Sequence, residues 1–389
     1  MASATASTEA INFEAREDRY SRQRLIPSWD QEKVSNAKIL VAGAGALGNE
    51  VLKNLALLGT GRILIIDFDR VETSNLSRSI LFREEDLGLP KASTAARALQ
   101  RLNPEIVVEA IDGDLECDLG LGELRDYDIV LGCLDSVHAR WLLNRACQKA
   151  ERPWINAGIN ASVGEISMHL PGQGACFECG MTRHMWQQIH ERRSCMSLPR
   201  KFSSTTIPTT TVIASLTAAL QVNEALACIH GRPRLSPGEM VMASLAPYSL
   251  SSFTNSMKPD CLAHDHYSPS IFIDASPDEL SSTELLSKIP GGVAVQLDFD
   301  VLEGWLCCNC GEQPAAERLS LRSAARLQCP DCQAQRSPQL THEIGRSERL
   351  ANVFLGRLGV PPRSILRVKT ESGPRHLELA GTRRNRSSR

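Results

Sequence analysis

The stretch KILVAGAGALG, residues 38–48, decides the fold. Residues 38–41 form a short apolar run typical of a buried strand, and an apolar helical pattern follows over residues 51–58. Glycines between a strand and a helix allow a tight turn and let backbone N–H groups approach a phosphate at the helix N-terminus. The glycines of this turn are Gly43, Gly45 and Gly48. The stretch therefore predicts a strand–turn–helix unit that binds a nucleotide.

Strand and helix patterns continue to alternate beyond this unit. Further strands are expected over residues 62–67, 106–110 and 129–133 and from residue 154, and helices over residues 92–102, 139–150 and 209–228. This alternation predicts an α/β fold with a doubly wound, mostly parallel Rossmann-like sheet over residues 16–265. Residues 173–207, rich in Cys, His, Arg and Pro, are expected to interrupt it as a crossover loop pinned by a metal.

The remaining chain is expected to divide into three parts. Residues 1–15 begin with a Ser/Thr/Ala-rich segment typical of a disordered N-terminus. Residues 266–382 are expected to form a smaller C-terminal zinc-ribbon unit, with a strand over residues 293–297 and a helix over residues 346–358. Residues 383–389 form a basic, solvated tail.

The charge balance and the apolar runs exclude several classes of protein. The 389 residues include 43 basic and 45 acidic side chains, a net charge of −2, which argues against a general nucleic-acid binder. The longest apolar stretch, near residues 212–222, is expected to be too short and too polar to span a bilayer. No signal-peptide pattern opens the chain, so we expect a cytoplasmic protein without membrane association.

Polar residues follow the strand ends, where sheets of this kind bind ligands. Asp67 ends the second strand and can accept hydrogen bonds from ribose hydroxyls. Asn75 and Arg78 come soon after and suit a triphosphate, whereas a nicotinamide cofactor has no evident need of them. Lys91 supplies a second cation at the next helix. Asp135, just past a later strand, can hold Mg²⁺ through phosphate oxygens and waters.

Six motifs occur in a recognisable order. They are RYSRQ (residues 19–23), GAGALG (43–48), DFDRVETSNLSR (67–78), GLPK (88–91), CLDS (133–136) and GACFEC (174–179). With them, residues 16–265 resemble the ubiquitin-activating-enzyme superfamily, and within it the bacterial adenylyltransferases that activate ubiquitin-like and sulfur-carrier proteins. The resemblance implies that the C-terminal glycine carboxylate of a carrier protein attacks the α-phosphate of ATP, giving an acyl adenylate and pyrophosphate. That attack requires charge neutralisation and alignment but no strong base.

The resemblance also implies roles for single residues. ATP and ribose contacts fall to Gly45 and Asp67, phosphate contacts to Asn75, Arg78 and Lys91, and Mg²⁺ to Asp135. Arg22 matches an arginine that family members supply across a homodimer interface. Ser79 and Ser136 depart from the pattern, because relatives usually carry Gln and Asn there, which leaves two polar contacts open.

Cysteine spacing predicts two structural zinc sites. The chain has 13 cysteines and no export signal, which favours metal ligation over disulfides. One CxxC pair followed by another, with 18 residues between them, is typical of a zinc ribbon; its ligands are Cys307 or Cys308, Cys310, Cys329 and Cys332, with Cys307 favoured. The other set has a long gap between its halves, and the resemblance supports its closure as a Cys₃His site. Its ligands are Cys176, Cys179, Cys261 and His264.

Whether the enzyme also forms a thioester is left open by the residues. Relatives that pass the acyl group to a cysteine carry it where Ser203 and Ser204 stand here. Cys195 lies a few residues upstream beside two arginines, which would lower its thiol pKa and favour the thiolate, so we predict it as the acyl acceptor. A ubiquitin-conjugating-type enzyme would then be a further partner. The alternatives are adenylation of a peptide or tRNA-bound carboxylate, and a non-catalytic scaffold.

Overall fold

The computed structural model describes residues 17–116, 118–193, 208–264, 271–318, 327–345 and 349–381. The helices are α1 (Gln31–Asn36), α2 (Ala46–Leu58), α3 (Lys91–Leu102), α4 (Leu121–Leu124), α5 (Val137–Ala150), α6 (Arg183–Arg193), α8 (Thr211–Ile229) and α9 (Ser282–Ser287). The strands of the N-terminal part are β1 (Lys38–Ala42), β2 (Arg62–Asp67), β3 (Val107–Asp112), β4 (Ile129–Gly132), β5 (Trp154–Ile159), β6 (Val163–His169), β7 (Glu239–Leu245) and β8 (Tyr248–Thr254). Those of the C-terminal part are β9 (Ile271–Ile273), β10 (Gly292–Cys307), β11 (Gly311–Arg318), β12 (Arg336–Gly345), β13 (Ile365–Thr370) and β14 (Gly373–Leu379).

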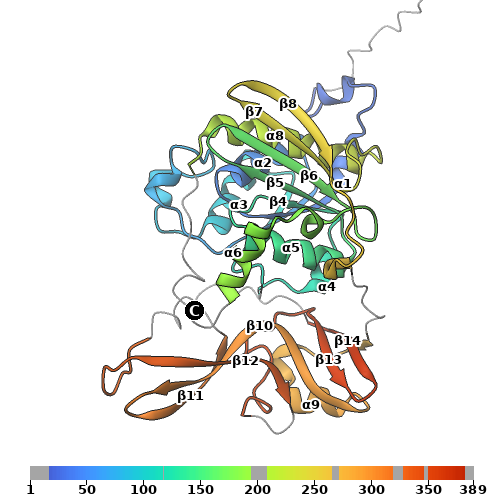
Figure 1. The fold of residues 1–389 in the computed structure, drawn as a ribbon. Helices are drawn as coiled ribbons and strands as arrows, with labels where there is room; N and C mark the ends of the chain where they lie inside the picture. The colour runs from blue at the N-terminus through green and yellow to red at the C-terminus, as the bar shows by residue number, and fades with distance from the viewer. Residues whose placement is uncertain are drawn as a thin grey trace, which may run out of the picture.

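The N-terminal part is built on one eight-stranded sheet (Figure 1). Its strand order is β3-β2-β1-β4-β5-β6-β7-β8, with parallel pairing from β3 to β5 and antiparallel pairing from β5 to β8. Because β2, β1 and β4 are neighbours and parallel, their carboxyl ends meet at one edge of the sheet. The predicted doubly wound, mostly parallel α/β sheet is confirmed.

Two hydrophobic clusters cover the two faces of this sheet, as the alternation of side chains along a strand requires. Ile39 and Val41 of β1 face the cluster that includes α2, α3 and α8, whereas Leu40 and Ala42 face the cluster that includes α4, α5 and α6. Every one of these four side chains is fully buried. The continuous apolar run of β1 in the sequence is therefore explained by burial on both faces.

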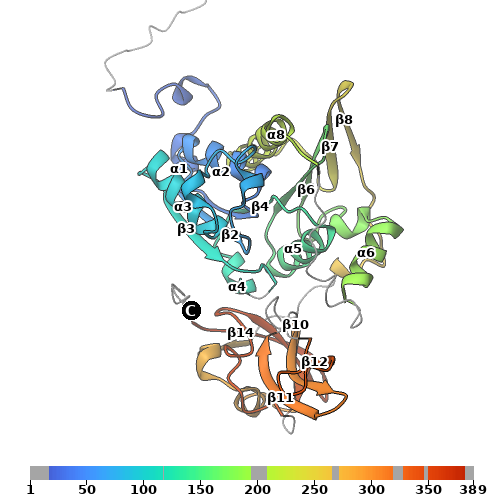
Figure 2. The same ribbon diagram turned by 90° about the vertical axis from the view of Figure 1, so that its left-hand side faces the viewer.

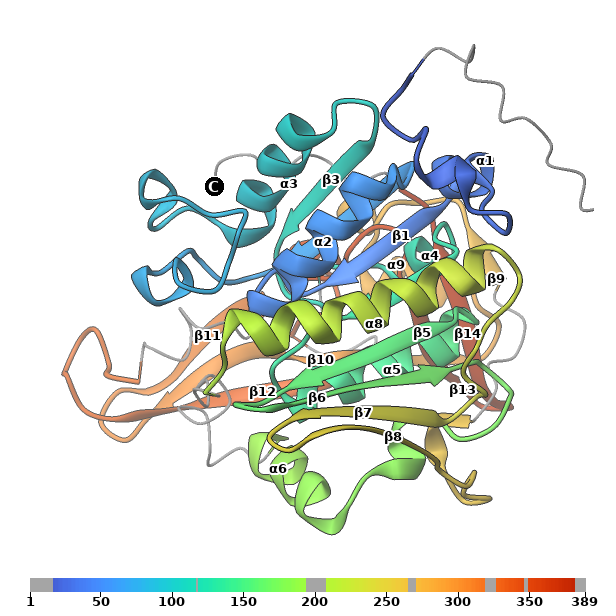
Figure 3. The same cartoon turned by 90° about the horizontal axis from the view of Figure 1, so that it is seen from above.

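Helix α8 lies in the core of this part. We expected its apolar run to be too short for a membrane span, and that expectation was wrong, since Thr211–Ile229 is long and apolar enough by length and composition. Its apolarity has another physical reason, because α8 packs against α2 on one side and against β5 and β6 on the other (Figure 3). Half of the apolar window is buried inside the protein.

Residues 173–193 also differ from the expected loop. A short 3-10 turn at Phe177–Gly180 and helix α6 occupy much of this segment, and α6 packs against α5. The sequence of α6 is strongly polar, with three apolar side chains to mark a face, so its helical periodicity is weak.

The C-terminal part has its own sheet and its own core (Figure 2). The order is β11-β10-β13-β14-β9, with β12 paired to β10. The long strand β10 extends well beyond the predicted residues 293–297 and pairs with β11, β12 and β13. The helix predicted over residues 346–358 was wrong: residues 349–358, the described part of that range, form turns. Their buried leucines, Leu350, Leu355 and Leu358, fill the core of this unit without regular structure.

Candidate active site and metal centres

Two of the three glycines in the turn lie too close to neighbouring backbone atoms to carry a side chain. Gly43 has a φ of +98°, and a Cβ there would lie 2.4 Å from the carbonyl oxygen of Cys133. A Cβ on Gly48 would lie 2.0 Å from the carbonyl oxygen of Gly43, so the third glycine brings α2 close to the turn. Gly45 is different, because a Cβ there would meet no heavy atom within 4 Å. The backbone at Gly45, the N-cap of α2, is therefore open to a ligand.

Asp67 organises this turn. Its Oδ2 accepts from the Ala44 N–H at 2.7 Å and its Oδ1 accepts from the Asp69 N–H at 2.8 Å. Burial raises the pKa of the Asp67 carboxyl, while the nearby Lys91 ammonium and the Ala44 hydrogen bond oppose that rise. Each oxygen keeps a further lone pair, so the carboxylate can also accept from a ribose hydroxyl.

The residues predicted to contact phosphates lie on the segment after β2 and at the start of α3. Asn75 is buried, and its Oδ1 accepts from the Glu72 N–H at 2.9 Å, which stabilises a 3-10 turn. Arg78 is half-buried and donates to the Ser74 carbonyl at 2.8 Å. Lys91 is buried, with its Nζ 2.8 Å from Asp69 Oδ2. Both cations therefore lie on segments that are fixed before any phosphate binds.

Asp135 is exposed and forms no hydrogen bond or ion pair with any described residue. A carboxylate just before a helix is often its cap, but here Ser136 is the N-cap of α5 and its Oγ accepts from the Ala139 N–H at 3.2 Å. Asp135 thus stands at the carboxyl end of β4 with both oxygens available for a cation. The donor set suits Mg²⁺, which takes one or two carboxylates together with phosphates and water.

Arg22 does not reach the glycine turn of its own chain. The neighbouring Gln23 donates to the carbonyl of Leu57, and the ring of Tyr20 lies against Gly59, at the C-terminal end of α2. Since α2 has 13 residues, this end lies about 20 Å from the turn. Arg22 is exposed. Cys195, the predicted acyl acceptor, lies outside the described residues.

Three residues that bear on this site were not found from the sequence. Asn49 is fully buried, donates to the carbonyls of Ala44 and Gly45 at 2.7 and 3.1 Å, and accepts from the Leu81 N–H at 3.0 Å. Asp69 holds Lys91, and its place in the motif DFD was the available signal. Arg140 donates to the carbonyl of Leu134, beside Asp135, at 3.1 and 3.2 Å. Nothing in the sequence indicates the hydrogen-bond partners of Asn49 and Arg140.

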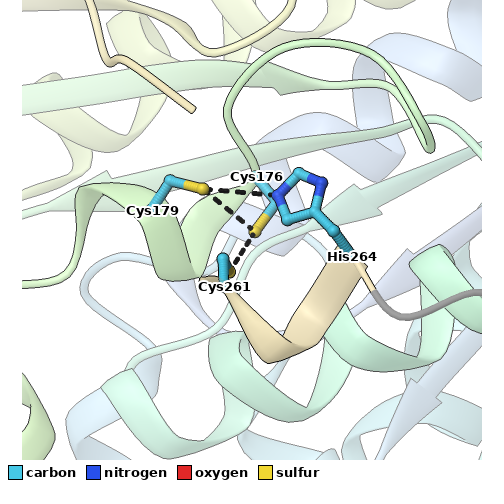
Figure 4. A group of neighbouring side chains, drawn as sticks. All are labelled: Cys176, Cys179, Cys261 and His264. Atoms are coloured by element: carbon cyan, nitrogen blue, oxygen red, sulfur yellow. Dashed lines mark hydrogen bonds between the residues drawn. The ribbon is translucent and has the colours of Figure 1, made fainter. Parts of the chain in front are cut away.

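The four predicted ligands of the first metal site come together (Figure 4). Cys176 Sγ lies 3.8 Å from Cys179 Sγ and 3.7 Å from Cys261 Sγ, and Cys179 Sγ lies 3.3 Å from His264 Nε2. A tetrahedral zinc ion with bonds of about 2.3 Å to sulfur places its sulfur ligands about 3.8 Å apart. Burial raises the pKa of the Cys176 thiol, so the thiolate form depends on a bound cation.

Two contacts attach this cluster to helix α5. Glu178, between the first two cysteines, is almost fully buried and accepts from Arg145 Nε and Nη2 at 2.8 and 3.1 Å. The Phe177 N–H donates to Asn144 Oδ1 at 3.1 Å. Because α5 begins two residues after Asp135, the cluster braces the same helix whose N-terminus faces the predicted nucleotide site.

The ribbon cysteines form the second cluster. Cys307 Sγ lies 3.5 Å from Cys332 Sγ, Cys329 Sγ lies 3.9 Å from Cys310 Sγ, and all four sulfurs lie within 4.8 Å of one another. Cys308 is outside this group, exposed, with its Sγ 3.7 Å from the Gln335 carbonyl oxygen. The geometry thus favours Cys307 over Cys308, as predicted. Although burial raises it, backbone N–H groups of Cys332 and Asp331 bring the pKa of Cys329 down to about 6.

Comparison with known proteins gives the family. Residues 20–263, more than half of the chain, match the model of the ThiF family. The chain belongs to the ThiF family. The match ends at the first metal cluster, so the ribbon unit lies outside the ThiF region.

Several relatives of this ThiF protein are named for activating reactions. It is 40% identical over 158 residues to SUMO-activating enzyme subunit uba-2 of Caenorhabditis elegans, which covers 40% of this chain and 27% of that protein. It is 38% identical over 170 residues to the sulfur carrier protein adenylyltransferase of Thermus thermophilus, covering 42% and 63%. The chain thus spans less than two thirds of the length of these relatives.

Solved structures show the same architecture. The crystal structure of Escherichia coli MccB with ATP superimposes with a TM-score of 0.53 at 26% identity, covering 65% of this chain and 75% of that chain. MccB has also been solved with N-formylated MccA, at a TM-score of 0.52 and 25% identity.

Proposed function

We propose that this ThiF protein adenylates the C-terminal glycine of a ubiquitin-like or sulfur-carrier protein with ATP. The observation that carries the proposal is the convergence of one open glycine turn, Asp67, Lys91 and Asp135, which has no partner among the described residues, at one edge of the sheet. The names of the uba-2 and Thermus relatives support the general reaction.

The chemistry follows from these residues. A carboxylate oxygen of the carrier forms a bond to the α-phosphorus of ATP while the bond from that phosphorus to the bridging oxygen breaks, and pyrophosphate leaves. No proton moves, which agrees with a site whose described residues offer cations and N–H groups and no evident general base. The N–H groups of the turn and Arg78 would bind phosphates, and Lys91 would exchange its Asp69 partner for a phosphate oxygen. Mg²⁺ held by Asp135 would neutralise charge on the leaving pyrophosphate.

We further propose a homodimer. Arg22 lies at the far end of α2 from its own glycine turn and is exposed, which supports a role in the site of a second copy. In that position the guanidinium would stabilise charge on the phosphates in the transition state.

A second step is proposed at Cys195. Its thiolate would attack the acyl carbon of the adenylate, forming a thioester and releasing AMP. A ubiquitin-conjugating-type enzyme would then accept the acyl group, whereas a sulfur-transfer pathway would use the activated glycine directly. The Ser–Cys–Met segment around Cys195 is outside the described residues, so this step rests on the sequence alone. The proposed setting is the cytoplasm.

The test is ATP–pyrophosphate exchange by the full chain. Carriers of the ubiquitin fold ending in Gly-Gly are supplied with a free or an amidated C-terminus. Exchange is expected only with the free carboxylate. Absence of exchange with every free carrier would refute the proposal. A non-reducing gel of the same mixture shows whether a thiol-sensitive band forms and whether Cys195→Ala removes it.

One alternative is adenylation of another carboxylate on the same fold, and the likeness to MccB, solved with ATP and with N-formylated MccA, is compatible with it. Exchange that is supported by a short peptide with a free C-terminus, and not by any folded carrier, would establish this alternative instead.

A further inference from the structure

In the described residues, the C-terminal unit contacts the connection between β3 and β4 near both of its ends, and the contacts near β4 include an ion pair between Arg125 and Glu378. Near β3, Arg318 at the end of β11 lies 3.1 Å from Asp118 and 3.6 Å from Asp114. Near β4, Arg363 pairs with Asp126 and donates to the Gly122 carbonyl at 2.7 Å. Both arginines come from outside the ThiF region, and Figures 1 and 2 show the C-terminal unit lying beside α4.

Only the first of these places is continuous with the proposed nucleotide site. Asp112, the last residue of β3, pairs in register with Asp67, and the Gly113 N–H donates to the Asp67 carbonyl at 3.2 Å. Asp112 also accepts from the Ser93 N–H at 2.9 Å, two residues after Lys91. The segment that starts at Gly113 therefore leaves the sheet directly beside Asp67. Arg363 instead holds the other end of the connection, where the chain enters the amino end of β4 on the side of the sheet away from Asp67.

The Asp118 carboxylate stabilises the segment after Gly113, and Arg318 balances its charge. Asp118 Oδ2 accepts from the Asp114 N–H at 2.8 Å and from Arg318 at 3.1 Å. The Asp114 and Asp118 carboxylates share Arg318, and without it two like charges would lie close together on one short loop. Gly113 is also tightly packed, since a Cβ there would lie 2.6 Å from Asp118 Oδ2.

We infer that Arg318 is a positioning residue for the ribose side of the ATP site, by which the C-terminal unit acts on nucleotide binding. This inference rests on the proposed function. Arg318 holds Asp114 and Asp118, which follow Gly113 in the chain, and the Gly113 N–H in turn holds the backbone carbonyl of Asp67. The zinc-ribbon unit is then connected to nucleotide binding through β11, which begins next to the ribbon cysteines and ends at Arg318.

The competing explanation is that Arg318 only fastens the two units together. Arg363 provides a control that separates the two explanations. It is a second arginine of the C-terminal unit, and it pairs with an aspartate of the same connection at the end remote from Asp67. Loss of either residue removes contacts between the units. Only loss of Arg318 releases the loop beside Asp67.

The experiment compares Arg318→Ala, Arg363→Ala and Arg318→Lys in the full chain. Calorimetric titration with ATP and Mg²⁺ gives the Kd, and thermal unfolding gives the Tm. We expect Arg318→Ala to raise the Kd for ATP about 3- to 10-fold, since a tenfold change corresponds to about 1.4 kcal/mol. Arg363→Ala should leave the Kd within about twofold at a similar loss of Tm, and Arg318→Lys should restore part of the affinity because it keeps the charge.

Equal changes of Kd in the two alanine variants, or none in either, would overturn the inference. If Arg318→Ala does not fold, Asp118→Asn replaces it, because the amide oxygen can still accept from the Asp114 N–H while the ion pair with Arg318 is lost. An unchanged Kd in that variant would likewise overturn it. A wild-type chain that binds no ATP would refute the proposed function itself, which is a different result.

Discussion

Replacing Gly48 by alanine should lower the stability of the fold, whereas replacing Gly45 should lower ATP affinity and leave the stability nearly unchanged. In Gly48→Ala, the new Cβ would stand 2.0 Å from the Gly43 carbonyl oxygen, a backbone atom that cannot rotate away. Overpacking costs about 1–3 kcal/mol, and the clash with backbone places this site near the upper value. Alanine recovers about 1 kcal/mol from its higher helix propensity. The net loss of about 2 kcal/mol should lower the Tm by about 4–8 °C.

Gly45→Ala should spare the fold and damage the site. Gly45 has φ −71° and ψ −160°, which alanine adopts, and its Cβ would meet no protein atom within 4 Å. The stability should therefore change by less than about 1 kcal/mol, the cost of alanine at an N-cap. The methyl group would instead occupy the space in which we place the phosphates, and ATP affinity should fall at least about tenfold.

Thermal unfolding with and without ATP measures both effects. A ligand at 100 times its Kd stabilises a protein by about 2.7 kcal/mol, so wild type should gain several degrees in Tm and Gly45→Ala much less. Gly48→Ala should start from a lower Tm. If Gly45→Ala gains as much from ATP as wild type, the turn does not hold the phosphates and the reasoning fails.

Four further outcomes are expected. Asp135→Asn should lower exchange at least about 100-fold with an unchanged Tm, because the exposed carboxylate has no described partner to lose; normal exchange would exclude it as the magnesium ligand. Mixing inactive Arg22→Ala with inactive Asp135→Ala should restore part of the activity through hybrid dimers, and no recovery would argue against a shared site. Metal analysis should give two zinc ions per chain and one for Cys329→Ser, and any other count in wild type contradicts the two-site prediction. Burial lowers the pKa of the His169 imidazole to about 4, so this residue contributes about 3 kcal/mol to the free energy of unfolding above pH 6.5, and the contribution is lost as the pH falls toward 4. His169→Gln should therefore flatten the dependence of the unfolding free energy on pH between 4 and 6.5, measured with excess zinc. An unchanged slope would contradict the lowered pKa of His169.

Local patterns were enough to predict the mostly parallel sheet of the N-terminal part and the candidate residues that follow its strands. A strand, a glycine turn and a helix are set by interactions between residues close in the chain, so residues 38–58 could be interpreted without the rest. The paired cysteines could also be predicted as metal ligands from local spacing, because two ligands of one knuckle must lie a fixed short distance apart in the chain. The parallel order of β2, β1 and β4 then placed Asp67 and Asp135 at one edge.

The amino-acid sequence by itself therefore determined the ThiF-type sheet, the two predicted sets of metal ligands and the charged residues at the strand ends. Only the tertiary structure decided which described partners those residues have: that Ser136 caps α5 in place of Asp135, that Asp69 holds Lys91, and that Arg22 lies near the end of α2 that is far from the glycine turn. It also decided that Arg318 reaches Asp118, which lies 200 residues earlier in the chain. The reason is physical: hydrogen bonds and ion pairs act over a few ångströms, and the distance between side chains far apart in sequence exists only once the chain has folded.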